Sequence, residues 1–277
     1  MATGGIGQDL PIIRGFGYSS AMITVFGDSL SVSGFGISFK RYLAGDIEFR
    51  GVMGQGILKI IKRAEDYLPQ AAPDEIIVIE GGGNDVLEVS KKWGCLPPRK
   101  PAGEVDFDTY RDWELKMSVR NHTVEFLEKD GFEAILSALM ARQTEAAARI
   151  KAMGRDVIVC STAVISEDPL SLFNRLCSEW NSAMRRDFGE EAYLDMYSPI
   201  LPLLRGRTDF IGGTLAELNA DSMIIDGSEQ KAMELAADRG FGGTIDGVHM
   251  NTAAARAVAK AWCRKFPLAL HFQPENN

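Results

Sequence analysis

Runs of consecutive apolar residues that stop at glycine-rich turns are the feature that most restricts the fold of this sequence. The runs "MITVFG" (22–27), "EIIVIE" (75–80) and "DVIVC" (156–160) have apolar side chains at almost every position. A strand of this kind is buried on both faces, which is typical of a parallel sheet covered by helices on each side. Apolar residues at helical spacing follow these runs, so the alternation predicts an α/β fold.

The expected elements alternate along most of the chain. Strands are expected within 22–27, 46–51, 75–85, 155–164 and 192–197, and helices near 37–45 and at 57–68, 132–154, 172–189 and 252–266. Two longer stretches, 91–130 and 205–243, interrupt the alternation, the second of them around short helices. Long stretches of this kind in α/β domains are usually lids, substrate loops or subunit contacts. We therefore expect one domain over residues 1–277 with two insertions.

Composition and charge argue against several classes of protein. The net charge of −8 disfavours a nucleic-acid partner, because such binding depends on clustered Lys and Arg. No apolar stretch approaches the roughly 18 residues that span a bilayer. The first residues, "MATGGIGQDLPIIRGFG", do not resemble a signal peptide, so we expect a cytoplasmic protein without a membrane span.

Cofactor and metal sites are not indicated either. The four cysteines lie far apart, without a C-x-x-C pair or a metal-like spacing to a histidine. Cys160 ends an apolar run, and we expect a buried free thiol there. The Gly-x-Gly pairs at 15–17 and 34–36 lack the third glycine and the downstream acid of a dinucleotide site.

Polar residues at the predicted strand ends offer the chemistry of nucleophilic catalysis. Ligands of parallel α/β sheets bind outside the carboxyl ends of the strands. Ser29 follows the first strand and Asn84 follows the third, while Asp246 and His249 stand just before the last helix. A serine becomes a good nucleophile when a histidine takes its proton and a carboxylate holds that histidine in the correct tautomer. The competing interpretation makes Ser29 only a helix cap.

Four short motifs resemble, in order, the sequence blocks of the SGNH hydrolases, also called GDSL esterases. The motifs are "FGDSLSVSG", "RGVMGQG", "GGGND" and "DGVHMN", and the resemblance runs from about Ile23 to Phe266. It implies a three-layer α/β/α sandwich with a flavodoxin-like parallel sheet, and a reaction that needs no metal or organic cofactor. The two insertions have no obvious counterpart in the family.

The same resemblance implies a role for each site residue. Ser29 would be the nucleophile, His249 the general base and later acid, and Asp246 the residue that orients His249. The oxyanion hole would consist of the backbone N–H groups of Ser29 and Gly54 together with the side-chain amide of Asn84.

The second motif fits the family least well. Gly54 aligns with the oxyanion glycine, but Gly51 and Gly56 are close enough to leave the register open. Three apolar residues replace the residues that the family usually has in or beside its motifs: Phe49, Met53 and Met250.

Other polar and aromatic residues receive structural interpretations. Asp28 is expected to accept backbone N–H groups of its own turn, and Asp85 to cap the segment after Asn84. His122 and His271 have no carboxylate at a useful spacing, and we assign them no function. Aromatic residues of the first insertion form either a substrate-binding wall or the local core of the insertion: Trp93, Tyr110 and Trp113.

The expected activity is hydrolysis of a carboxylic ester through an acyl-enzyme intermediate. Because no long apolar segment suggests an interfacial lipase lid, we favour a short-chain acyl ester, such as an acetylated carbohydrate. Two alternatives stay open, an acyltransferase that uses the same groups and a non-catalytic binding protein with this fold. Contacts of a homo-oligomer would lie at the insertions, and the sequence does not settle the number of subunits.

Overall fold

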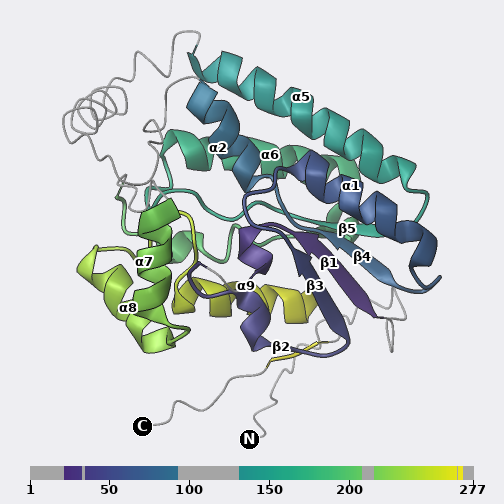
Figure 1. Ribbon diagram of the computed structural model, residues 1–277. Coiled ribbons are helices and arrows are strands. Elements are labelled where there is room, and N and C mark those ends of the chain that lie inside the picture. The colour runs from purple at the N-terminus through teal and green to yellow at the C-terminus, as the bar shows by residue number, and fades with distance from the viewer. Residues whose placement is uncertain (1–21, 33–34, 93–130, 208–214, 267, 271–277) are drawn as a thin grey trace, which may run out of the picture.

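A parallel sheet forms the centre of the molecule (Figure 1). The structure, a computed structural model, describes residues 22–32, 35–92, 131–207, 215–266 and 268–270. Five strands, all paired in parallel, make up the sheet in the order β3-β1-β4-β5-β6. Their bounds are β1 Ile23–Gly27, β3 Ile47–Gly51, β4 Ile76–Ile79, β5 Val157–Cys160 and β6 Tyr193–Leu194. Counted along the chain, this order is 2-1-3-4-5, the flavodoxin-like arrangement that we expected.

Helices cover both faces of this sheet (Figure 1). One layer consists of α1 (Ile57–Tyr67), α2 (Gly83–Lys92), α5 (Gly131–Ala152) and α6 (Leu172–Phe188), which pack on one another. On the opposite face lies α9 (Thr252–Lys265), which contacts α8 (Glu229–Asp238), and α8 in turn packs on α7 (Leu215–Ile225). The three-layer α/β/α sandwich is therefore confirmed, as are short helices within 205–243.

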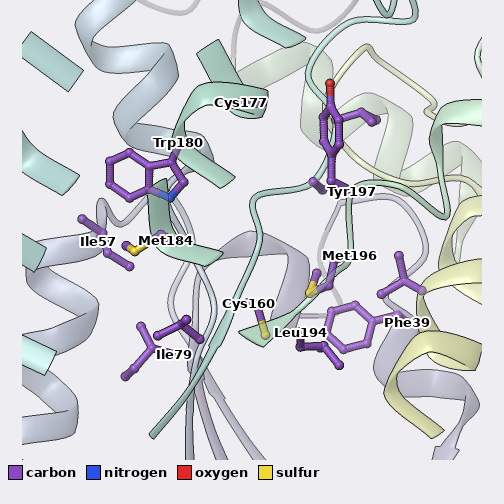
Figure 2. Packing of buried hydrophobic residues seen from close by; sticks show 14 of the residues in the cluster. Phe39, Ile57, Ile79, Cys160, Cys177, Trp180, Met184, Leu194, Met196 and Tyr197 are labelled. Carbon is purple, nitrogen blue, oxygen red and sulfur yellow. The ribbon is translucent and has the colours of Figure 1, made fainter. Parts of the chain in front are cut away.

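Large apolar side chains fill the space between the layers. In Figure 2, Trp180 and Ile57 lie on one side of the sheet and Phe39 lies on the other. Trp262 of α9 stacks on Phe39, with 5.2 Å between ring centroids, and both are completely buried. Cys160 is buried with a free thiol, as expected. None of the helices in the described part of the chain combines the length and apolar character that crossing a membrane requires.

The prediction of a helix near 37–45 is confirmed only for four residues, and the rest of the stretch is not helical. The chain forms only a 3₁₀ turn, Phe39–Tyr42, and then the two-residue strand β2 (Leu43–Ala44). Phe39 and Tyr42 are three residues apart and both buried, which suits a turn with three residues per repeat. Antiparallel pairing of β2 with β7 (Ala269–Leu270) then extends the backbone and ends the helical geometry.

The strand order determines where a site can form. After β1 the chain first adds β3 on one side and then β4 on the other, so β1 stands at the point where the strand order reverses. Gly27 at the end of β1 pairs with Gly51 at the end of β3, and Phe26 pairs with Ile79 at the end of β4. The turns after these three strands therefore lie side by side, at the place where open α/β sheets bind their ligands.

Candidate active site

Ser29 begins a short 3₁₀ turn, Ser29–Ser31, directly after β1. Asp28 caps this turn, since its Oδ1 accepts the N–H of Leu30 at 3.0 Å. The structural role expected for Asp28 is therefore confirmed. Ser29 itself is half-buried, and neither its N–H nor its hydroxyl is hydrogen-bonded to any of the described residues. Within the described part of the chain, no group competes with a ligand for either of them.

The turn after β3 contains Gly51, Gly54 and Gly56. The sequence left open which of these three aligns with the oxyanion glycine of the family. Gly51 is the last residue of β3, and Gly56 is the N-cap of α1. Gly54 lies between them on an exposed turn with φ +70°, a conformation that side-chain-bearing residues rarely adopt. Its N–H donates to no described residue. The N–H of Gly56 also donates to no described residue, but Gly56 is half-buried at the start of α1, whereas Gly54 is exposed on the turn itself.

Asn84 connects the three neighbouring turns. It lies in the first turn of α2, and its Nδ2 donates to Asp28 Oδ2 at 2.9 Å and to the backbone oxygen of Gln55 at 3.1 Å. These bonds join the turn of Ser29 to the turn of Gly54. They also engage both hydrogens of the amide, so a ligand that accepts from Asn84 has to replace one of them.

Asp85 caps a different helix from the one expected. Its Oδ2 accepts the N–H of Ile57, the first residue of α1, at 2.7 Å, and Arg142 pairs with its Oδ1 at 3.3 Å. Gly56, the N-cap of α1, has no side chain to accept that N–H. Asp85 replaces the missing cap from the adjacent helix α2, which the sequence order alone does not reveal.

Asp246 and His249 form a buried hydrogen-bonded pair. His249 Nδ1 lies 2.6 Å from Asp246 Oδ2, and the side chains are only 8% and 2% exposed. Asp246 Oδ1 also accepts the backbone N–H groups of Val248 and His249, at 2.8 and 2.7 Å. Gly247, with φ +92°, allows the tight turn that brings the two side chains together. The pair has the arrangement in which a carboxylate fixes the orientation of an imidazole.

The segment after the Ser29 turn packs against the loop of His249. Ile37 donates its N–H to the backbone oxygen of Met250 at 2.9 Å, and the Phe35 ring lies 5.3 Å from the His249 ring. Gly36 has φ +65°, and a Cβ atom there would lie 3.0 Å from His249 Cβ. These contacts bring His249 to the edge of the sheet that carries Ser29. Ser29 Oγ makes no hydrogen bond to His249 in this structure.

Electrostatics favour a basic imidazole at this position. Burial is the largest single influence on His249 and disfavours its charged form, whereas the charge and the hydrogen bond of Asp246 favour it. The charges of Asp28 and Asp221 act in the same direction, and the pKa of His249 rises above its ordinary value of 6.5. A stronger base accepts a serine proton more readily at neutral pH. Burial also raises the pKa of Asp28, to about 6.

Glu167 is a buried carboxylate that the sequence analysis did not single out. Its Oε1 accepts the N–H groups of Gly243 and Thr244 at 2.9 and 2.6 Å, and its Oε2 accepts that of Gly242 at 2.9 Å. Glu167 therefore holds the strand-like segment that leads into Asp246. The only hint in the sequence is an acidic residue shortly after a buried strand, which is not distinctive.

Arg63 on α1 was also missed. Its guanidinium donates to the backbone oxygens of Gly27 and Arg50, at the ends of β1 and β3, and to the side chain of Gln55 at 2.8 Å. Desolvation by burial lowers the pKa of this group. One cation thus ties together the two strand ends from which the turns of Ser29 and Gly54 depart.

Among the described residues, no group of three or more His, Cys, Asp or Glu side chains is arranged so that it could hold a metal ion. Several sequence candidates lie outside the described residues and are not placed: His122, His271, Cys95, Trp93, Tyr110 and Trp113.

Comparison with known proteins gives matches among solved structures only. A scan against protein-family models finds no match, and neither does a search of curated proteins. The acetyl xylan esterase AlAXEase matches with a TM-score of 0.42 at 14% identity, over 88% of this chain and 98% of that one. A member of the lipolytic G-D-S-L family from Veillonella parvula matches with 0.45 at 14%, over 90% and 99%. The catalytic domain of peptidoglycan O-acetyltransferase A from Streptococcus pneumoniae matches with 0.41 at 9%, over 89% and 92%. The chain is thus similar to solved proteins that include an esterase, a G-D-S-L protein and an acetyltransferase.

Proposed function

We propose that this chain is a serine hydrolase of the SGNH type, which cleaves a carboxylic ester through an acyl-enzyme intermediate. The observation that carries the proposal is the buried pair of His249 and Asp246, 2.6 Å apart, on a loop packed against the segment after Ser29. If Ser29 were only a helix cap, nothing would explain why a buried His–Asp pair lies at the edge of the sheet where α/β proteins bind their ligands.

The proposed reaction uses Ser29 as the nucleophile. His249 accepts the hydroxyl proton on Nε2 while Ser29 Oγ attacks the ester carbonyl carbon, and Asp246 stabilises the resulting imidazolium. The tetrahedral intermediate collapses as His249 returns the proton to the leaving alcohol. Water then attacks the acyl-enzyme with the same general base and releases the carboxylic acid.

The negative oxygen of the intermediate needs donors that are already in place. We assign this role to the N–H groups of Ser29 and Gly54, which are free of hydrogen bonds to described residues, and to the amide of Asn84. In this proposal the oxyanion replaces Gln55 as the second acceptor of Asn84 Nδ2, because that 3.1 Å bond is the longer of the two. Asp28 keeps the amide oriented throughout.

We propose a short acyl group as the part of the substrate that the site accepts, on a small alcohol or a carbohydrate. The support is the exposed apolar surface that the described residues offer beside Gly54, where Val52 and Met53 are 40% and 50% exposed. Two side chains of this size cover a few carbon atoms of an acyl chain but not a long one. The rate should therefore fall as the acyl chain of the ester grows.

Hydrolysis of p-nitrophenyl esters of increasing acyl length tests the proposal. Ser29→Ala should reduce turnover by several orders of magnitude, because the acyl-enzyme cannot form. Ser228→Ala is a matched control, since Ser228 caps α8 and its loss costs about 1 kcal/mol of stability without touching the site. Equal activity in the wild type and Ser29→Ala would contradict the proposal. Product analysis with added acceptor alcohols separates hydrolysis from acyl transfer.

A further inference from the structure

We infer that Glu80 is a positioning residue for the Ser29 nucleophile, because one oxygen of its buried carboxyl group holds the residues on both sides of Ser29. The inference rests on the proposed function of Ser29 and adds a residue that acts through it. Glu80 does not touch the reacting atoms.

The hydrogen bonds of Glu80 enclose the nucleophile turn. Glu80 directly follows β4, is 1% exposed, and donates its own N–H to Phe26 of β1 at 2.9 Å. Its Oε2 accepts the backbone N–H of Asp28 at 3.1 Å and the hydroxyl of Ser31 at 2.8 Å. A single carboxyl oxygen therefore holds the residue before Ser29 and the residue two positions after it.

Gly27 shows that the turn is built around this carboxyl group. A Cβ atom at Gly27 would lie far inside van der Waals contact of both Glu80 Oε2 and Ser31 Oγ. Gly27 does not have a positive φ, so backbone freedom does not explain the glycine. The glycine of the GDSL motif in this chain is therefore needed to leave room for the bonds between Glu80 and the turn.

These bonds determine the direction in which Ser29 presents its reactive groups. The turn has only three residues and one internal backbone bond, from Val32 N–H to Ser29 O at 3.2 Å. The Asp28 carboxylate, which accepts from Leu30 and Asn84, also holds the turn. Without Glu80, the N–H of Asp28 and the hydroxyl of Ser31 lose their acceptor, and the turn can shift about the bonds that remain. A misplacement of about 1 Å at a reacting group can cost on the order of 100-fold in rate.

The charge state of Glu80 adds a second consequence. The titratable groups that face it are Asp28 on the nucleophile turn and the Cys160 thiol on β5, and no described cation pairs with it. Burial, aided by the charge of Asp28, raises the pKa of Glu80 to about 8. Glu80 is thus mainly neutral at pH 7, and its ionisation places a negative charge under the turn where the oxyanion forms. Turnover should therefore decline as the pH rises through the pKa of Glu80.

The test compares Glu80→Ala, Glu80→Gln and the control Glu75→Ala. Glu75 is a buried carboxylate just before the opposite end of β4, where it accepts from Tyr67 Oη and the N–H of Ala72. All proteins are assayed below their melting temperatures, with kcat and KM measured from pH 6 to 10. We expect Glu80→Ala to lower kcat about 100-fold with little change in KM. Glu80→Gln, whose carbonyl oxygen can accept the same two bonds, should keep kcat within a few-fold at pH 7 and lose the alkaline decline.

The outcomes separate this inference from the proposed function. Glu75→Ala should lower the melting temperature while leaving kcat and the pH profile unchanged, since it lies at the far end of the strand. If the wild type is active and Glu80→Ala has the same kcat as Glu75→Ala, the positioning role of Glu80 is overturned, while the proposed function stands. A Glu80→Gln variant that keeps the wild-type alkaline decline overturns the role of charge. If the wild type does not turn over the ester and Ser29→Ala makes no difference, the proposed function is overturned, and the role of Glu80 with it.

Discussion

At the scale of single residues, the pair of Asp246 and His249 makes the sharpest prediction about pH. The proposed general base His249 must be neutral to act, so activity should be lost as the pH falls through its pKa, which Asp246 raises above the ordinary value of 6.5. Asp246→Asn removes the charge that favours imidazolium, and the acid limb of kcat/KM should move to lower pH. The maximal rate should fall by about 10⁴-fold, because the imidazole loses the group that fixes its tautomer. An acid limb that stays in place would contradict the assignment of Asp246.

Residues that lie within short motifs could be predicted from the sequence, whereas the distant residues that hold these motifs in place could not. Ser29 stands in an unaltered GDSL motif, and Asp246 and His249 are three residues apart. Glu80 reaches Asp28 across 52 positions and Glu167 reaches Thr244 across 77, so only the folded chain shows these contacts. Carboxylates in such places look like ordinary acidic residues in the sequence.

At the scale of elements, Glu167 links the chain after β5 to the loop that carries Asp246 and His249. Glu167→Ala leaves the N–H groups of Gly242, Gly243 and Thr244 without their acceptor. Buried donors that lose their partners cost roughly 1–3 kcal/mol each, so the free energy of unfolding should fall by about 3 kcal/mol or more. Denaturant unfolding measures the change, with the exposed Glu179 on α6 as the control substitution to Ala. A loss no larger than that of the control would show that Glu167 is not a support of this loop.

Strands and long helices could be predicted because their apolar patterns are long and regular. The strands within 22–27 and 46–51 and the helices at 57–68 and 252–266 appear within about one residue of their expected bounds. The stretch 37–45 has apolar residues at similar spacing, yet pairing of Leu43–Ala44 with a strand near the C-terminus decides its conformation. A contact between distant segments overrides the local pattern there.

At the scale of the whole molecule, Glu80 makes stability depend on pH. Its pKa rises from an ordinary value of 4.5 to about 8 on folding, so the folded state binds this proton more tightly than the unfolded state. The resulting contribution to stability is fully present below pH 4.5 and is lost as the pH rises toward 8. Glu80→Gln cannot lose a proton, and its melting temperature should fall less than that of the wild type between pH 5 and 9. Parallel melting curves of the two proteins would argue against a neutral, buried Glu80.

The central claim is that Ser29 is an activated nucleophile, and covalent labelling tests it most directly. A serine-directed fluorophosphonate should add once to the wild-type protein, and peptide mass spectrometry should place the adduct on Ser29. Ser29→Ala should take up no label, and Asp246→Asn should label much more slowly because His249 is no longer oriented. A wild-type protein that stays unlabelled, or a label that persists in Ser29→Ala, would contradict the claim.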